Sequence, residues 1–192
     1  MRIDLDYLKS RLKEQVPEHR YIHSIGVAES AKKLAIHFGA DPLKAEIAGI
    51  LHDYTKYWPK DQLAKVIKEN PELSPDLLDY SPELWHGPVA SIIIQTEFQI
   101  EDQEIIDAIH YHTSGREKMT LLDKVVCLAD YIEPSRDYPG VNEIRALANE
   151  SIEKSLVQAL DGTIQFLMKK GWKIYPLTMI ARNSLIDEMN DK

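Results

Sequence analysis

Apolar side chains recur at steps of three and four residues over most of this chain, which is the spacing of helices that bury one face. The first clear run starts after Pro17 and stops at Gly39, and these residue types suit the start and the end of one helix. A second start signal follows in Asp41 and Pro42, an N-cap before a first-turn proline. Residues 47–51 behind it are apolar on almost every side, so we expect this segment deep in the core.

The same spacing predicts helices along the rest of the chain, over about 59–70, from Pro88, and over about 101–113, 119–133, 142–170 and 178–189. No run alternates with a period of two, and neither a repeat of 20–50 residues nor a low-complexity linker divides the chain. At 192 residues, one domain is the expected number. The pattern therefore predicts a single all-α domain with no substantial sheet.

Composition and charge narrow the class of protein without changing this architecture. Hydrophobic residues make up 44% and charged residues 28%, as in soluble globular proteins. A net charge of −8 disfavours nucleic acid and anionic membranes as partners, because both are themselves negative. The single cysteine, Cys127, excludes an intrachain disulfide and suits a reducing compartment. With no secretory or membrane-spanning segment in view, we expect a cytoplasmic protein.

Candidate chemistry lies on the faces predicted to be buried. Histidines and aspartates from five predicted helical segments point inward: His23, His52, Asp53, His86, His110 and Asp130. A lone histidine on an apolar face is usually a hydrogen-bonded core residue. A buried carboxylate, however, needs a cation or strong donors, and six such groups together are best satisfied by divalent cations. The sequence therefore predicts a metal cluster inside the helical domain.

Two ions would share this donor set. We expect one on His23, His52, Asp53 and Asp130, and the other on His86, His110 and the bridging Asp53. Imidazole and carboxylate without thiolate suit iron, manganese, cobalt, nickel or zinc. Two ions about 3.5–4 Å apart can generate a bridging hydroxide for phosphoryl displacement. His112 projects away from His110 around a regular helix, so we do not expect it on a metal unless the helix has ended before it. In a continuing helix it would contact the substrate's phosphates or donate a proton near the cleft.

The spacing of these residues matches the HD superfamily of metal-dependent phosphohydrolases, and His86 and His110 resemble the ligands that its two-metal members add. Over almost its entire length, the chain also resembles the bacterial YqeK family of symmetrical diadenosine tetraphosphate hydrolases. The matching stretches are HRYIHSIGVAESA (19–31), AGILHDYTK (48–56), HGPVA (86–90), IHYHTSG (109–115), LADYIEPSR (128–136), GVNEIR (140–145) and PLTMIARN (176–183).

The resemblance implies a single HD-type helical domain over residues 1–192, with a metal core at about 18–135 and C-terminal helices at about 141–190 packed on it. It implies two divalent transition-metal ions, iron first, with manganese, cobalt or nickel as alternatives. It also implies hydrolysis of diadenosine tetraphosphate, a phosphoric anhydride, into two molecules of ADP. A dinucleoside polyphosphate would then be the substrate partner and ADP the product.

A polyphosphate needs local cations to bind a chain of negative net charge. Arg20 lies one helical turn before His23 in the sequence, and Lys56 and Arg136 follow the segments that carry metal ligands. We expect Lys56 and Arg136 to act with Asp53 in catalysis, and Arg20 and Arg136 to bind phosphate. Thr178 and Arg182 are four residues apart on the last predicted helix and are expected to clamp a terminal phosphate or ribose.

Three other interpretations share these residues. An HD-type nucleotidase would use the same ligands on mononucleotides, and a catalytically silent module would bind a nucleotide without turnover. A buried polar network without metal is the third. The sequence leaves open whether the chain forms a homodimer.

Overall fold

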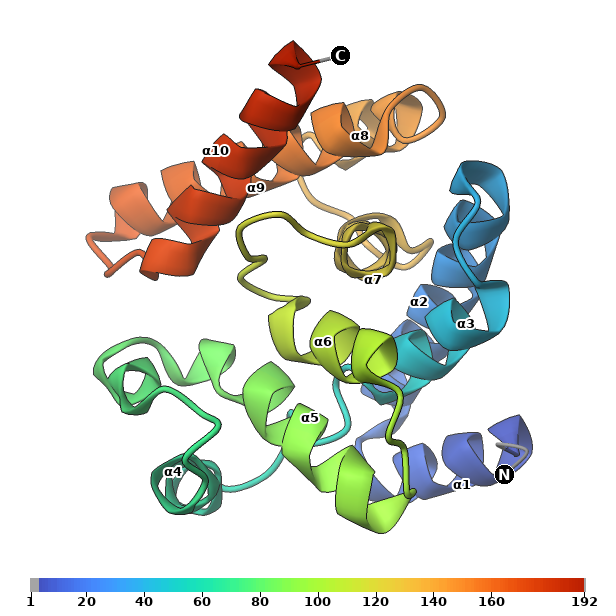
Figure 1. The fold of residues 1–192 in the computed structure, drawn as a ribbon, viewed down its shortest axis with the longest axis vertical. Helices are drawn as coiled ribbons and strands as arrows, with labels where there is room; N and C mark the ends of the chain where they lie inside the picture. The colour runs from blue at the N-terminus through green and yellow to red at the C-terminus, as the bar shows by residue number, and fades with distance from the viewer. Residues whose placement is uncertain (1–3, 192) are drawn as a thin grey trace.

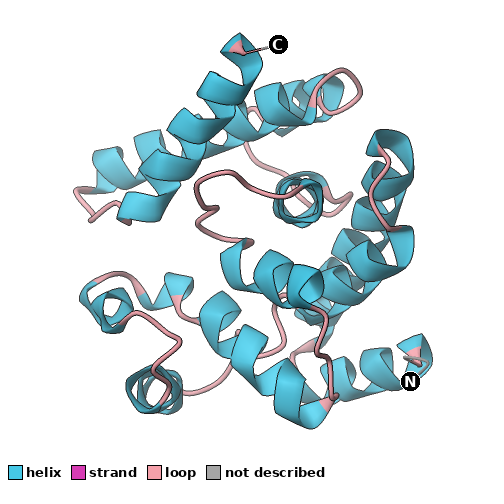
Figure 2. Ribbon diagram, in the orientation of Figure 1, coloured by secondary structure: helices cyan, strands magenta, loops and turns pink. Residues whose placement is uncertain are grey.

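The computed structural model describes residues 4–191, and Figures 1 and 2 show that the described part of the chain contains helices and loops but no strand. This confirms the all-α prediction. The α-helices are α1 (Leu5–Gln15), α2 (Glu18–Phe38), α3 (Pro42–Leu51), α4 (Lys60–Glu69), α5 (His86–Glu97), α6 (Gln103–Tyr111), α7 (Leu121–Ile132), α8 (Val141–Leu147), α9 (Ile152–Lys170) and α10 (Pro176–Asn190). Two short 3-10 helices, η1 (Pro75–Asp79) and η2 (Pro82–Leu84), lie between α4 and α5.

The signals at the ends of α2 and α3 act as the sequence predicts. Pro17 precedes the first residue of α2, and Gly39 ends it in the left-handed region at φ +85°. The side chain of Asp41 accepts hydrogen bonds from the first backbone N–H groups of α3. Local capping chemistry therefore sets the ends of the two helices that carry the first metal-type residues.

The predicted helix over 142–170 is two helices. Helix α8 ends at Leu147, and α9 begins at Ile152 after the N-cap Ser151, whose hydroxyl accepts a hydrogen bond from the backbone of Lys154. Serine competes for local backbone hydrogen bonds and so favours a helix start over a helix interior. Apolar spacing continues across the break, which is why periodicity alone joins the two segments.

Two further differences concern other helix boundaries. Helix α6 ends at Tyr111, two residues before the predicted end, and α5 starts at His86 instead of Pro88. The N-terminal helix α1 has no counterpart in the prediction, and it packs Leu8 and Leu12 into the main hydrophobic core. The early end of α6 bears directly on the site, because His112 follows it at once.

Helices α2 and α3 pack closely enough that one contact tolerates only glycine. A Cβ built on Gly49 would lie 2.5 Å from the Cα of Ala28, which is closer than real Cβ atoms come to backbone. Helix α7 packs against both α2 and α9, and Figure 1 shows it end-on between the α2–α3 pair and the group of α8, α9 and α10. It thus joins the half of the molecule that carries the histidines to the C-terminal helices.

An ion-paired lysine ties the C-terminal helices to α7. Lys124, 6% exposed, places its Nζ 3.1 Å from a carboxylate oxygen of Glu153 on α9 and 2.5 Å from one of Glu188 on α10. A largely buried charge needs such partners. Within residues 4–191, no helix is both long enough and apolar enough to cross a bilayer.

Candidate active site

Five helices bring histidine and aspartate side chains to one point beside α7. His23 comes from the middle of α2, His52 and Asp53 from the end of α3, and His86 from the start of α5. The carboxylate of Asp53 faces both sides of the group. Its Oδ2 lies 3.7 Å from His23 Nε2 and 3.4 Å from His52 Nε2, and its Oδ1 lies 3.0 Å from His86 Nε2. Asp53 therefore stands between two sets of imidazoles.

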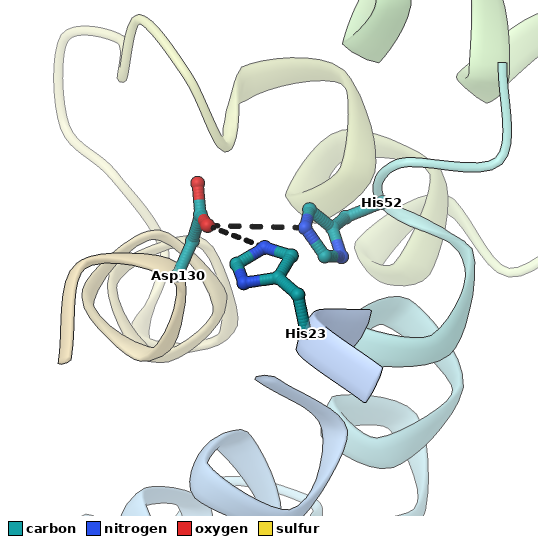
Figure 3. Close-up of side chains that lie close together, drawn as sticks. All are labelled: His23, His52 and Asp130. Carbon is teal, nitrogen blue, oxygen red and sulfur yellow. Dashed lines mark ion pairs between the residues drawn. The ribbon is translucent and has the colours of Figure 1, made fainter. Parts of the chain in front are cut away.

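Asp130 completes the first set. Its Oδ1 lies 3.1 Å from His23 Nε2 and 3.9 Å from His52 Nε2, as drawn in Figure 3, where the three side chains approach one another from three different helices. The ligand atoms of these three residues all lie within 4.8 Å of one another. With Asp53 Oδ2, they form the donor set predicted for the first ion.

Hydrogen bonds at Nδ1 orient three of the imidazoles toward the group. An oxygen accepts from each Nδ1: Glu133 Oε1 at 2.9 Å for His23, Gly49 O at 2.8 Å for His52 and Ile109 O at 2.7 Å for His112. A proton held on Nδ1 leaves the lone pair of Nε2 free for a metal. Nε2 of His23 and Nε2 of His52 are buried and have no hydrogen-bond partner among the described residues. Divalent cations would satisfy these atoms, so the residues fit the implied metals.

The second set contains His112 instead of His110. His112 Nε2 lies 3.0 Å from His86 Nε2 and 4.0 Å from Asp53 Oδ1. Because Nδ1 of His112 faces a carbonyl, its Nε2 presents a lone pair to the other imidazole. A cation shared by both nitrogens would hold them this close together.

The structure places His110 away from this group, which corrects the predicted ligand set. Its Nδ1 lies 3.1 Å from the hydroxyl of Ser91, and burial lowers its pKa to about 4. The spacing predicted that His110 points inward because it follows the apolar Ile106 by four residues, but α6 has a second buried face. Ile105 and Ile109 lie on that face, and His112 continues it at the next step of three.

The pKa shifts at this site keep Asp53 ionised and keep the imidazoles of His86 and His112 neutral. Burial raises the pKa of Asp53, but His52 and His86 reverse this effect and hold that pKa well below its ordinary value. Burial also lowers the pKa of His86, and it lowers the pKa of His112 to about 3. At neutral pH, the second set therefore offers two neutral imidazoles to an ionised carboxylate, as divalent transition metals require.

Glu133 is part of the site and was not predicted. It is 1% exposed, holds His23 by Nδ1 and accepts hydrogen bonds from both the backbone and the hydroxyl of Ser135. Gly26 makes room for it, since a Cβ there would lie 2.6 Å from Glu133 Oε2. The only signal in the sequence is a carboxylate three residues after Asp130 at a helix end, which gives no indication of His23 as its partner.

Three of the cations predicted to bind substrate or act in catalysis lie at the cleft, and each has an acidic partner. Arg20 donates to Asp53 Oδ2 at 2.9 Å, and Arg136 pairs with the Asp130 carboxylate and donates to the Asp130 carbonyl at 2.7 Å. Lys56 Nζ lies 2.6 Å from a carboxylate oxygen of the exposed Glu83. Two of the three cations thus touch carboxylates of the donor group itself.

Thr178 and Arg182 do not reach the cleft, contrary to the prediction for them. Thr178 is 3% exposed, and Arg182 pairs with Asp161 at 2.8 Å. Neither residue lines the cleft described below. Their helix, α10, packs against α9 and presents this pair to the interior and to α9 instead.

The donor group opens into a cleft of about 1230 Å³. Its lining includes Asp53, His86, His112 and Asp130 together with residues of α8 and α9. Ligand pockets are commonly about 300–1,000 Å³, so this cleft has room for a ligand larger than a mononucleotide. A group of imidazoles and carboxylates that opens into such a cleft fits a metal-dependent hydrolase.

The model of the HD domain family matches residues 20–135, which carry every member of the donor group. The chain therefore belongs to the HD family. The "Bis(5'-nucleosyl)-tetraphosphatase, symmetrical" of Bacillus subtilis (strain 168) is 49% identical, and the match covers 91% of this chain and 94% of that protein. The protein of the same name from Halalkalibacterium halodurans is 43% identical over 92% of this chain and 94% of its own.

A solved structure has the same fold. The crystal structure of a "predicted HD superfamily hydrolase involved in NAD metabolism" from Clostridium acetobutylicum is 36% identical, with a TM-score of 0.92 over 96% of this chain and 98% of that chain. Together with the relatives above, it confirms the resemblance to YqeK-type HD hydrolases.

Proposed function

We propose that this chain hydrolyses diadenosine tetraphosphate into two molecules of ADP in the cleft that ends at Asp53. The chain is a phosphoric anhydride hydrolase of the HD family, and the symmetrical reaction is the one in the names of its relatives. The single structural observation that carries the proposal is Asp53, whose two oxygens face two separate imidazole sets. Such a carboxylate would hold one cation with each of its oxygens.

The chain's own residues assign the ligands. His23, His52, Asp130 and Asp53 Oδ2 would hold one ion, and His86, His112 and Asp53 Oδ1 would hold the other. When bound, two divalent cations supply an activated water and neutralise charge on the phosphate oxygens. Imidazole and carboxylate without thiolate suit iron, and manganese, cobalt and nickel share this preference. We propose iron as the native metal.

Three side chains handle the charge of the substrate. Arg20 and Arg136 hold the carboxylates of Asp53 and Asp130 in place and face the cleft beside them. Lys56 is bound only to an exposed carboxylate, so a phosphate can replace Glu83 as its partner at little cost. We expect Lys56 to stabilise the charge that develops on the leaving phosphate.

The reaction balances with water as the only co-reactant. Its oxygen bonds to one of the two central phosphorus atoms, and the bond from that phosphorus to the central bridging oxygen breaks. That oxygen leaves as a terminal phosphate oxygen of the second ADP, which is already stable as an anion, and the protons of the water pass to solvent. Symmetrical cleavage requires two phosphates on each side of the point of attack, and a cleft of about 1230 Å³ supports a substrate larger than a mononucleotide.

Product chromatography tests the proposal. Protein loaded with iron or manganese should convert diadenosine tetraphosphate to ADP alone, and the chelated protein should not. AMP with ATP would exclude symmetrical cleavage. Rapid hydrolysis of mononucleotides without turnover of the dinucleotide would support the nucleotidase instead. Elemental analysis of the purified protein tests iron separately, and less than half an equivalent of any metal would favour the buried polar network.

A further inference from the structure

Gly162 lies in the interior of α9 at a position where the fold does not require glycine. Its φ lies outside the left-handed region, and no neighbouring atom of the described structure comes within 4 Å of the place that a Cβ would take. Glycine in a helix interior lowers stability relative to alanine, and alanine would fit here without a clash. Gly162 is exposed, and the packing of this chain does not require glycine there.

The open space belongs to the cleft. Gly162 lines it together with Lys154, Gln158 and Phe166, which are spaced at steps of four residues along α9. Residues at this spacing lie on one face of a helix. One face of α9 therefore forms a wall of the same cleft that ends at the metal-type cluster.

The side chains on this wall suit a purine base. Phe166 is 51% exposed although it is a large aromatic residue, and exposed aromatic rings in binding sites stack on bases. Gln158 forms no side-chain hydrogen bond with the described residues. A glutamine amide can both donate to and accept from the N6 and N7 edge of adenine. Between them, Gly162 carries no side chain and leaves room for a ring.

We infer that one nucleoside of the substrate lies against α9, with its adenine over Gly162 between Gln158 and Phe166. The inference rests on the proposed function and adds the place of a base, which the metal cluster alone does not give. Lys154, one turn before Gln158 on the same face, lies near the edge of this nucleoside site. The remaining nucleoside has to lie elsewhere along the cleft.

The substitution Gly162→Trp tests this, because it fills the open space without touching the metal-type cluster. The KM for diadenosine tetraphosphate should rise at least about tenfold, as loss of one base contact implies. Inhibition by inorganic tripolyphosphate, which has phosphates but no base, should stay within about twofold of the unmodified protein. Metal content should also stay unchanged.

Two variants serve as controls. Met168→Trp puts the same side chain on α9 at a 66% exposed residue outside the cleft and should leave the KM unchanged. Gly162→Ala should raise the Tm by about 2 °C, because it removes a helix-interior glycine. If Gly162→Trp fails to fold, Gln158→Leu takes its place and should raise the KM at least about fivefold.

The outcomes separate the two proposals. Failure of the unmodified protein to form ADP from diadenosine tetraphosphate would reject the proposed function. An unmodified protein that forms ADP, together with a Gly162→Trp variant of unchanged KM, would reject only the nucleoside site. An equal loss of tripolyphosphate inhibition in Gly162→Trp would also reject it, since the substitution would then act on the phosphate end.

Discussion

The two walls of the cleft differ in how tightly their side chains are held. On the cluster wall, His52 is fully buried, Asp53 and His86 are each 3% exposed, and the surrounding helices and carbonyls fix the imidazole rings. On the α9 wall, Phe166 is half exposed and Gly162 faces open space. The comparison indicates that metal ligands need preorganisation by their own protein, whereas a wall that binds a base has to leave room for it.

Removing the carboxylate of Asp53 should have the largest effect, because it abolishes metal binding on the cluster wall. We expect Asp53→Ala to lose both ions and to reduce hydrolysis by roughly 10³-fold or more, because both donor sets depend on it. Metal analysis and ADP production measure the two losses. The exposed Asp76→Ala provides the matched control, and retention of two equivalents of metal in Asp53→Ala would contradict the bridging role.

A second test asks whether His112 or His110 binds the second ion. His112→Ala should reduce hydrolysis by more than about 10²-fold and lower metal content from two equivalents toward one, since a direct ligand matters more than its outer partners. His110→Ala should keep both ions, because its ring nitrogen contacts Ser91. Metal loss in His110→Ala, with two equivalents retained in His112→Ala, would restore the ligand set predicted from the sequence.

A substitution of Glu133 tests whether the fixed orientation of His23 contributes to metal affinity. Glu133→Gln should weaken metal binding about 10- to 100-fold while preserving the fold, because it removes the charge that orients His23. Metal titration monitored by calorimetry gives the dissociation constant, and the exposed Glu143→Gln is the control. Unchanged metal affinity would mean that the His23 ring is held by packing alone.

The smallest effect concerns the start of α6, the helix that positions His112. The Asp102 side chain caps this helix, and Lys44 lies 2.8 Å from its carboxylate. Asp102→Ala should lower the free energy of unfolding by about 1 kcal/mol at pH 7. Urea unfolding measures the difference, and the exposed Glu101→Ala should show none.

The pH dependence of this effect has a defined sign. Burial raises the pKa of Asp102, but Lys44 and the backbone N–H groups at the start of α6 lower it by more. The pKa of Asp102 therefore lies below its ordinary value. A carboxyl whose folded pKa is depressed stabilises the fold above its unfolded pKa and loses this effect as the pH falls through the folded pKa. The difference in the free energy of unfolding between the unmodified protein and Asp102→Ala should therefore shrink below about pH 4. A difference that stays constant with pH would mean that the substitution acts through helix propensity and not through the charge of Asp102.

Much of the cluster could be predicted from the sequence, and the reason differs between residues. Asp53 and Asp130 stand in apolar helices where an ionised carboxylate needs a partner, so their burial alone pointed to cations. His112 escaped prediction because α6 has two buried faces and periodicity could not tell which one meets α5. Glu133 escaped because its partner His23 is 110 residues away along the chain.

The sequence by itself determined the helices, most of their ends and the residue types available for a metal, because capping and amphipathic spacing act over a few residues. The tertiary structure decided which imidazole pairs with which carboxylate, that Thr178 is buried and Arg182 paired with Asp161, and that Gly162 faces a cleft. Those outcomes depend on how α5, α6, α7 and α9 pack against one another. Packing of this kind is set by the summed fit of distant side chains, which no local pattern contains.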